Sequence, residues 1–180
     1  METFTDIRPL IADPDYHNRR QAVIKSLDLN ELDEPVIELV KDFLTLPYCF
    51  TLQSCYGHFV HDDQKNPGNI EPLTGADHIS VVEYRIAYIA VCIQNNDSGS
   101  LLLNDLRKIP AIDPQYIQFG CAQWFWKQHI NSYALQVEPE RYREKDSAHV
   151  DFQEALHLEK VRNKFFSNLK QLISKRTKAV

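Results

Sequence analysis

The sequence lacks most of the features that mark membrane, secreted and dinucleotide-binding proteins. No apolar run approaches the roughly 18 residues that a membrane span requires, so we expect no membrane partner. The N-terminus has neither a basic start nor an apolar stretch, which argues against a signal peptide. There is no Gly-x-Gly-x-x-Gly fingerprint, and the four cysteines match no disulfide framework. We therefore expect a cytoplasmic protein with reduced thiols.

Positive charge is also scarce. The chain has 20 Lys and Arg against 25 Asp and Glu, and its net charge of −5 argues against a surface built for DNA. The distribution is uneven, because residues 159–180 carry seven basic side chains and one acidic one. A basic helix there can contact phosphate, as a tRNA partner would require, but a solvated helix face is the more ordinary interpretation.

The residues that are present predict one domain, 1–180, with an α/β fold. A chain of 180 residues, 43% of them hydrophobic, is long enough to bury one proper core. Apolar periodicity predicts a mixed β-sheet of four to five strands flanked by helices, with a long amphipathic helix at the C-terminus. The expected helices are 14–27, 34–46, 101–109 and 147–175, and the expected strands are 48–54, 79–93, 116–126 and 133–138.

Two segments are expected to lack regular structure. Residues 60–78 contain two prolines and two glycines with almost no apolar periodicity, so they should form a long loop. This loop is either a lid over a neighbouring site or a passive insertion. Residues 176–180 are expected to be a disordered tail.

Residues 48–58 concentrate reactive side chains. The stretch begins with the alternation of a strand that has one better-buried face. Ser54, Cys55 and His58 then follow closely, and Gly57 allows a positive φ or a close backbone approach. We expect these groups to meet at the strand end, where small sites are commonly built. The ordinary alternative is that Cys55 is a buried small hydrophobe and His58 a surface side chain.

The same cluster admits two further chemistries. Cys55 would be a nucleophile if the imidazole of His58 favoured its thiolate form. Alternatively, Cys55, His58 and His61 could bind zinc together with a carboxylate from Asp62 or Asp63. Structural zinc sites usually use paired Cys-x2-Cys clips, which this sequence does not have, so the sequence assigns no metal ligand.

An aromatic triplet, Trp124-Phe125-Trp126, falls in the expected strand 116–126. Neighbouring side chains on a strand point to opposite faces, so at least one ring must lie on the second face of the sheet. There it either covers a helix or forms a platform on which a base or an adenine ring can stack. Packing within an aromatic core is the default interpretation.

Residues 34–40, the strand after them and the motif at 54–58 together resemble the tRNA wybutosine-synthesising protein 3 family. In that family an acidic-started helix leads into the motif T-T-S-S-C-x-G-R. The resemblance covers about residues 20–60 of this chain. The positions that match are Asp33-Glu34 and Glu38-Leu39 in the helix, and Ser54, Cys55 and Gly57 in the motif. Gln53 replaces the first serine of the motif, and His58 stands where the family has arginine.

The resemblance implies an S-adenosylmethionine-dependent methyltransferase that modifies a tRNA base at the end of the strand 48–54. The alternative is a non-enzymatic domain that binds a small molecule or a protein and keeps the family's shape without its reaction. On the enzymatic interpretation the catalytic residues are Ser54, Cys55 and His58, and the cofactor-binding residues are Gln53, Gly57 and Trp124.

Overall fold

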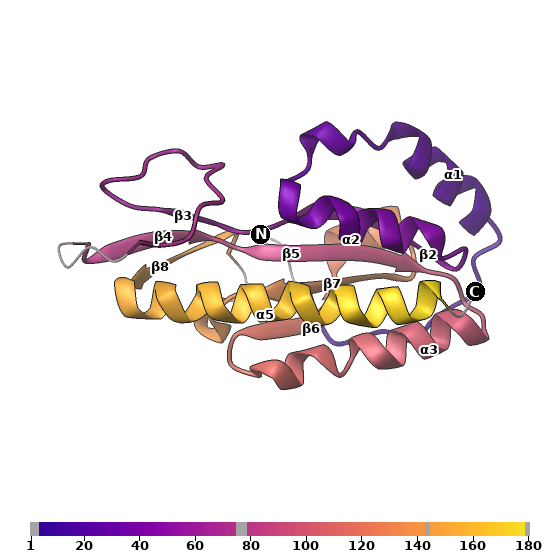
Figure 1. Cartoon of the computed structure of the whole chain (residues 1–180). Helices are drawn as coiled ribbons and strands as arrows, with labels where there is room; N and C mark the ends of the chain where they lie inside the picture. Colours follow the sequence, from indigo (N-terminus) through magenta and orange to yellow (C-terminus); the bar gives the residue numbers. More distant parts are fainter. Residues whose placement is uncertain (1–3, 75–78, 143–144, 179–180) are drawn as a thin grey trace.

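The computed structural model describes residues 4–74, 79–142 and 145–178, and the strands in this part of the chain form two sheets (Figure 1). The larger sheet has five strands in the order β1-β6-β7-β5-β2, and the smaller has three in the order β3-β4-β8. The strands are β1 Phe4–Thr5, β2 Cys49–Cys55, β3 His58–Val60, β4 Val81–Arg85, β5 Ala87–Ile93, β6 Ile117–Ala122, β7 Ser132–Val137 and β8 Ser147–Asp151.

Every pairing between these strands is antiparallel. The α/β class and a main sheet flanked by helices are as predicted, but the expected mixture of strand directions is not found. For β6 and β7 the connection explains the difference. A parallel pair needs a crossover of a dozen or more residues, whereas β6 and β7 are joined by one short helix. The second sheet was not predicted.

Helices α2, α3 and α5 pack into the main core on one face of the larger sheet, and the shorter α1 and α4 pack on the other face. Figure 1 shows α5 running along the sheet, with α2 above it and α3 below it. α2 and α5 pack against each other over the main hydrophobic core. The helices are α1 Tyr16–Ser26, α2 Glu34–Thr45, α3 Asp97–Leu106, α4 Gln123–Gln128 and α5 Phe152–Thr177, with 3₁₀ turns η1 Leu29–Glu31, η2 Ile109–Ile112 and η3 Glu140–Tyr142.

The alternation of side chains along β2 divides the core into two parts. Cys49 is buried in the main core with α2 and α5. Its neighbour Phe50 points to the other face, where it contacts Tyr16 of α1. The buried Phe125 of α4 contributes to a further small cluster on that face. The face opposite α2 and α5 is therefore only partly covered.

The prediction of a single strand at 79–93 is wrong. The chain forms β4 and β5, which belong to different sheets and meet at Ile86. The buried hydroxyl of Tyr84 stabilises this break, because it donates to the Val137 carbonyl at 2.9 Å and accepts from the Ala87 amide at 3.0 Å. No glycine, proline or other turn residue marks the break, so the sequence pattern does not reveal it.

Two other boundaries also differ from the prediction. The expected strand 116–126 ends at Ala122, and the aromatic triplet lies on α4 instead. The expected helix at 147–175 begins with strand β8, and Asp151 then caps α5 by accepting from the Glu154 amide at 2.8 Å. α5 continues to Thr177, so the expected tail begins as helix, whereas residues 179–180 lie outside the described residues.

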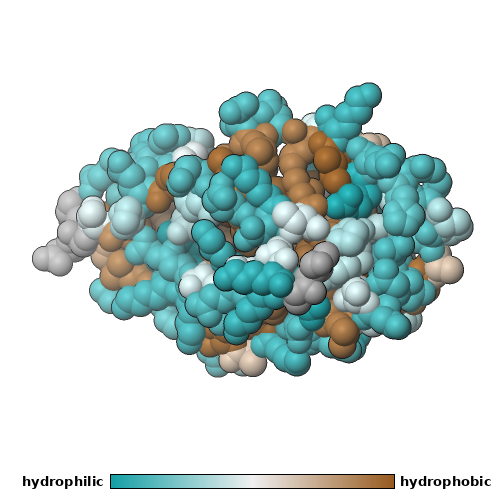
Figure 2. All heavy atoms as spheres, turned by 45° about the vertical axis from the view of Figure 1, so that its right-hand side comes forward, coloured by the Kyte–Doolittle hydropathy of each residue, from teal (hydrophilic) through white to brown (hydrophobic). Residues whose placement is uncertain are grey.

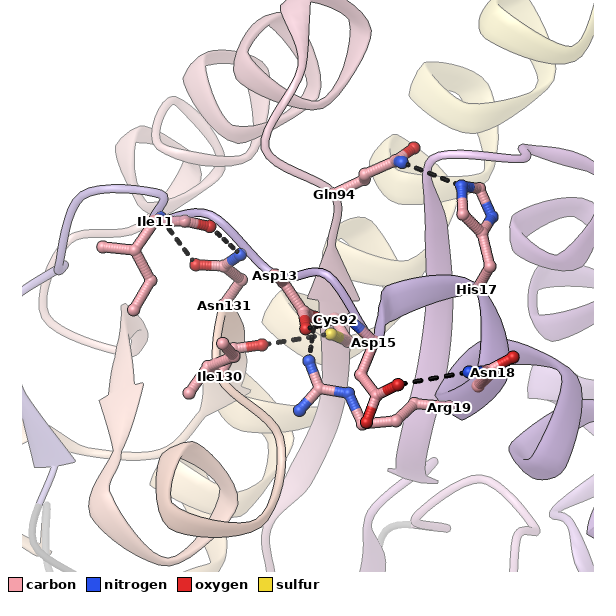
Figure 3. Close-up of polar contacts among 10 residues, drawn as sticks. All are labelled: Ile11, Asp13, Asp15, His17, Asn18, Arg19, Cys92, Gln94, Ile130 and Asn131. Atoms are coloured by element: carbon pink, nitrogen blue, oxygen red, sulfur yellow. Dashed lines mark hydrogen bonds and ion pairs between the residues drawn. The ribbon is translucent and has the colours of Figure 1, made fainter.

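The N-terminal segment is tied to the end of the larger sheet, as Figure 3 shows. The Ile11 amide donates to Asn131 Oδ1 at 2.9 Å, and Asn131 Nδ2 donates to the Ile11 carbonyl at 2.8 Å. Asn131 is fully buried and has a φ of 64°, a conformation that asparagine tolerates better than most residues. Arg19 of α1 pairs with Asp13 in the same region.

The surface in Figure 2 is mostly polar, and its most extended apolar area lies near the top of the view. The α1 region at the top of the molecule contains the partly buried apolar residues Val23, Ile24 and Leu27. Tyr16 is the one buried residue of α1. Within the residues described, no helix has both the length and the apolar character that crossing a membrane requires.

Candidate functional site

The candidate site lies where the chain passes from the larger sheet to the smaller one. β2 ends at Cys55 and β3 begins at His58. Gly57 makes the turn between them with a φ of 87°, and a Cβ atom added there would lie 2.8 Å from the Cβ atom of Ala87. The prediction that Gly57 adopts a positive φ and approaches another segment closely is confirmed.

Three side chains converge beside this turn. Asp33 lies at the N-cap position of α2, Cys55 at the end of β2 and His58 at the start of β3. A carboxylate oxygen of Asp33, Cys55 Sγ and a ring nitrogen of His58 all lie within 4.8 Å of one another. His58 Nε2 is 3.3 Å from Asp33 Oδ2. Cys55 and His58 therefore meet as predicted, and the sequence did not predict Asp33 as their partner.

Backbone groups hold each of the three side chains. The Tyr56 amide donates to Asp33 Oδ2 at 2.7 Å, and the Gly57 amide donates to Cys55 Sγ at 3.4 Å. His58 Nδ1 lies 3.2 Å from the Asn69 carbonyl, so the loop 60–78 contributes directly to the site. Such contacts orient the side chains independently of any ligand.

The proximity of these groups changes their pKa values. Hydrogen bonding to Asp33 and then to Cys55 raises the pKa of His58 to about 10, against the effect of burial. Burial alone would raise the pKa of Asp33, but the hydrogen bonds from His58 and from the Tyr56 amide outweigh it and hold this pKa below its ordinary value. In the protein alone, His58 and Asp33 are therefore an imidazolium and a carboxylate at neutral pH.

A buried arginine donates a hydrogen bond to the backbone of the turn at Gly57. Arg162 of α5 is only 2% exposed, and its Nη1 donates to the Gly57 carbonyl at 2.9 Å. Its guanidinium lies 4.2 Å from the centre of the Tyr56 ring and 3.6 Å from Glu159. This member of the basic C-terminal stretch is thus a structural residue of the fold and is not available to phosphate.

A cavity of about 830 Å³ opens in front of Cys55 and His58. It lies between the smaller sheet, α4 and the partly covered face of the larger sheet. The floor includes Tyr88 and Gln136, which are cross-strand neighbours on β5 and β7. Besides the imidazolium of His58, the charged side chains at the cavity are Glu83, Arg85 and Asp146. Of the residues predicted from the sequence, Gln53, Cys55, His58 and Trp124 line it.

Ser54 and Gly57 do not line this cavity, so placing them at the pocket was wrong. Ser54 precedes Cys55 on the same strand and points to the other face, where its buried Oγ has no hydrogen-bond partner among the described residues. Gly57 is buried against Ala87 and contributes through its backbone alone. Strand alternation forbids Ser54 and Cys55 from facing one ligand.

Of the residues that the sequence grouped with Cys55 as zinc ligands, His58 lies beside it, and His61, Asp62 and Asp63 lie elsewhere. His61 and Asp63 line a second cavity, of about 480 Å³, formed with the loop that follows them. Asp62 forms an ion pair on the surface, with its Oδ1 2.7 Å from Lys65 Nζ. Pro67 from the same loop reaches the larger cavity. Residues 75–78, the end of this expected loop, lie outside the described residues.

Comparisons with known proteins assign no family. No protein-family model matches the sequence, and no curated protein matches it. A similar solved structure is the PH1069 protein from Pyrococcus horikoshii, which is 15% identical, with a TM-score of 0.49 over 89% of this chain and 93% of that one. At this level of similarity the comparison assigns no activity.

Proposed function

We propose that this chain is a relative of tRNA-modifying S-adenosylmethionine-dependent methyltransferases, with its cofactor and target base in the large cavity. The observation that carries the proposal is that one cavity is lined by Gln53, Cys55, His58 and Trp124. Its volume of about 830 Å³ is near the upper end of the roughly 300–1,000 Å³ typical of small-molecule sites. That is room for a nucleoside-sized cofactor and part of a second group.

The lining groups suit the parts of this cofactor. The indole of Trp124 is 50% exposed at the cavity and offers a face on which adenine can stack. Glu83 and Asp146 provide carboxylates for ribose hydroxyls or for the positive sulfonium. The amides of Gln53 and Gln136 can donate to and accept from the edge of a base. An aromatic face with a few convergent polar groups is typical of such sites.

Methyl transfer places modest demands on the protein's acids and bases. The acceptor nitrogen forms a bond to the methyl carbon, and the sulfonium sulfur keeps the electron pair of the broken bond and becomes a neutral thioether. The acceptor then loses its proton to water or to a carboxylate such as Glu83 or Asp146. Orientation of the two reactants supplies most of the rate.

The contacts of His58 also favour a second candidate. Asn69 and Asp33 engage both of its ring nitrogens, so His58 has no free nitrogen with which to act as a base at the cavity. A domain that binds an adenosyl compound or another small molecule without transforming it needs the cavity but no catalytic base. This candidate predicts binding without turnover.

Calorimetric titration of S-adenosylmethionine into the full chain tests the cavity. We expect saturable heat with the parent protein and binding about 5- to 150-fold weaker with Trp124→Ala, because base stacking contributes about 1–3 kcal/mol. Leu101→Ala is the matched control, since Leu101 is an exposed side chain of α3 away from the cavity. Absence of heat in the parent would contradict the proposal.

Transfer of a labelled methyl group from the cofactor to tRNA separates the two candidates. Label in the tRNA that depends on Trp124 supports the methyltransferase. Binding of the cofactor without label in any tRNA fraction supports the binding domain.

A further inference from the structure

The cluster of Asp33, Cys55 and His58 combines three of the side-chain types that bind transition metals, a carboxylate, a thiol and an imidazole. We propose that it binds one zinc ion through Asp33, Cys55 and His58, leaving a fourth coordination position open to the large cavity. The proposal does not depend on methyl transfer, because it concerns the turn between β2 and β3 and not the part of the cavity that would hold an adenosyl group.

The separation of the ligand atoms suits a tetrahedral ion. Zinc bonds to nitrogen and oxygen of about 2.0–2.1 Å place two such ligands about 3.3 Å apart at the tetrahedral angle. His58 Nε2 and Asp33 Oδ2 are 3.3 Å apart, whereas charge-assisted hydrogen bonds are about 2.7–2.9 Å long. Cys55 Sγ lies within 4.8 Å of a ring nitrogen of His58 and of a carboxylate oxygen of Asp33. With a zinc–sulfur bond of about 2.3 Å, tetrahedral coordination places the sulfur about 3.6 Å from each of the other two ligand atoms.

The contacts of His58 determine which of its ring nitrogens can bind the metal ion. Its Nδ1 faces the Asn69 carbonyl, which can only accept a hydrogen bond, so Nδ1 must carry a proton. Zinc binding displaces the second proton of the imidazolium into solvent, and the lone pair that ligates the ion is then on Nε2, which faces Asp33. A backbone carbonyl is one of the common groups that accept a hydrogen bond from the second ring nitrogen of a zinc-bound histidine.

Each ligand has its own backbone contact. The Tyr56 amide holds Asp33, the Gly57 amide donates to the sulfur of Cys55, and the Asn69 carbonyl holds His58. Three separate segments, the start of α2, the β2–β3 turn and the loop after β3, are thereby fixed around one point. Such a shell raises metal affinity because the ligands lose little freedom on binding.

The open position defines the kind of site. Cys55 and His58 line the large cavity, whereas Asp33 does not. Structural zinc sites are closed by four protein ligands, whereas sites that act on a bound molecule keep three and leave one position to water or to the ligand. The expected fourth ligand is therefore water, or an anionic or carbonyl oxygen of a molecule in the cavity. A mixed sulfur, nitrogen and oxygen set favours zinc over magnesium or calcium.

Metal analysis of the full chain, stripped with a chelator and reloaded with zinc, is the first test. We expect one equivalent of zinc to remain after gel filtration. Cobalt(II), which reports its ligands, should give a near-ultraviolet sulfur-to-cobalt charge-transfer band and the strong visible bands of four-coordinate cobalt.

Variants distinguish the proposed ligands from adventitious binding. Cys55→Ser should abolish the charge-transfer band, and Asp33→Asn should weaken zinc binding about tenfold or more. The surface pair His157 and Asp113 has Nε2 and Oδ2 3.0 Å apart and is the matched control, so Asp113→Asn should leave zinc and cobalt binding unchanged. Far-ultraviolet circular dichroism establishes that each variant is folded.

The outcomes are decisive in either direction. A charge-transfer band that Cys55→Ser removes and Asp113→Asn preserves supports the site. A parent protein that retains no zinc, or a cobalt band that survives Cys55→Ser in the folded protein, overturns it. Neither result depends on whether S-adenosylmethionine binds, so failure of the metal site and failure of the proposed function are distinguishable.

Discussion

Asp33 and His58 are 25 residues apart in the sequence, yet Asp33 Oδ2 and His58 Nε2 are 3.3 Å apart in the fold. Asp33 lies at the start of α2, and His58 begins β3 of the smaller sheet. Their side chains are 22% and 9% exposed, respectively. The contact therefore joins the main helical layer to the junction of the two sheets, beside the cavity.

Replacing one member of this pair should destabilise the metal-free protein. In chelator-treated protein we expect Asp33→Asn to lower the free energy of unfolding by about 1–2 kcal/mol, because the partly buried imidazolium loses its counter-charge. Urea denaturation measures the change. Asp113→Asn removes the partner of the more exposed His157 and should change stability by less than about 0.5 kcal/mol. Equal effects of the two variants would contradict the importance of the Asp33–His58 contact.

The turn at Gly57 should tolerate no side chain. We expect Gly57→Ala to lower the free energy of unfolding by about 2–3 kcal/mol, since its φ of 87° disfavours L-residues and the new Cβ would lie 2.8 Å from that of Ala87. Gly68→Ala is the control, because the nearest atom to its added Cβ is Asn66 Oδ1 at 3.7 Å. Chemical denaturation of both variants tests this, and a stable Gly57→Ala protein would count against the strained turn.

Arg162 should matter far more than the other basic residues of α5. Arg162→Met removes the donor to the Gly57 carbonyl and leaves Glu159 without this cation, so we expect a loss of about 2–4 kcal/mol in unfolding free energy. Lys164→Met, at an exposed position of the same helix, should change it by less than about 0.5 kcal/mol. Thermal and urea unfolding provide the comparison. A near-neutral Arg162→Met would show that the buried cation is dispensable.

The contact between α3 and the end of α5 should weaken in acid. A hydrogen bond from Lys108 and another from Arg176 hold the pKa of Asp105 below its ordinary 3.8, against partial burial. Because the folded pKa is the lower one, the stabilisation is fully present above the unfolded value and is lost as pH falls through the folded value. The stability difference between the parent and Asp105→Asn should therefore shrink on acidification. A difference that is constant with pH would refute this.

Local sequence patterns predicted the elements that depend on neighbours in the chain. Helices α1 and α2 follow the predicted bounds closely, because a proline near the start and an apolar stripe are local signals. The expected strand 79–93 is a case that local signals did not predict correctly, because the stretch forms two strands of different sheets. Strand-forming residues lie on both sides of Ile86 with no turn residue between them, whereas the change of sheet there depends on the Tyr84 hydroxyl and on the Val137 carbonyl of a distant strand.

The residues of the candidate site also fall into those predicted from local sequence and those placed by tertiary contacts. Cys55 and His58 are three residues apart, so a turn at Gly57 sufficed to predict that they meet. Ser54 was misplaced because its direction follows from the register of β2 against β5. Asp33 was missed because at the start of a helix it has an ordinary capping interpretation, and only the packing of α2 brings it to His58.

The sequence by itself determined the α/β class, the principal helices and a reactive cluster after β2, because periodicity and turn residues act over a few positions. The tertiary structure decided the division into two sheets, the cavity between them and the third member of the cluster. These features depend on contacts between segments such as 33–45 and 145–162, whose meeting is set by burial of the whole core rather than by any local pattern.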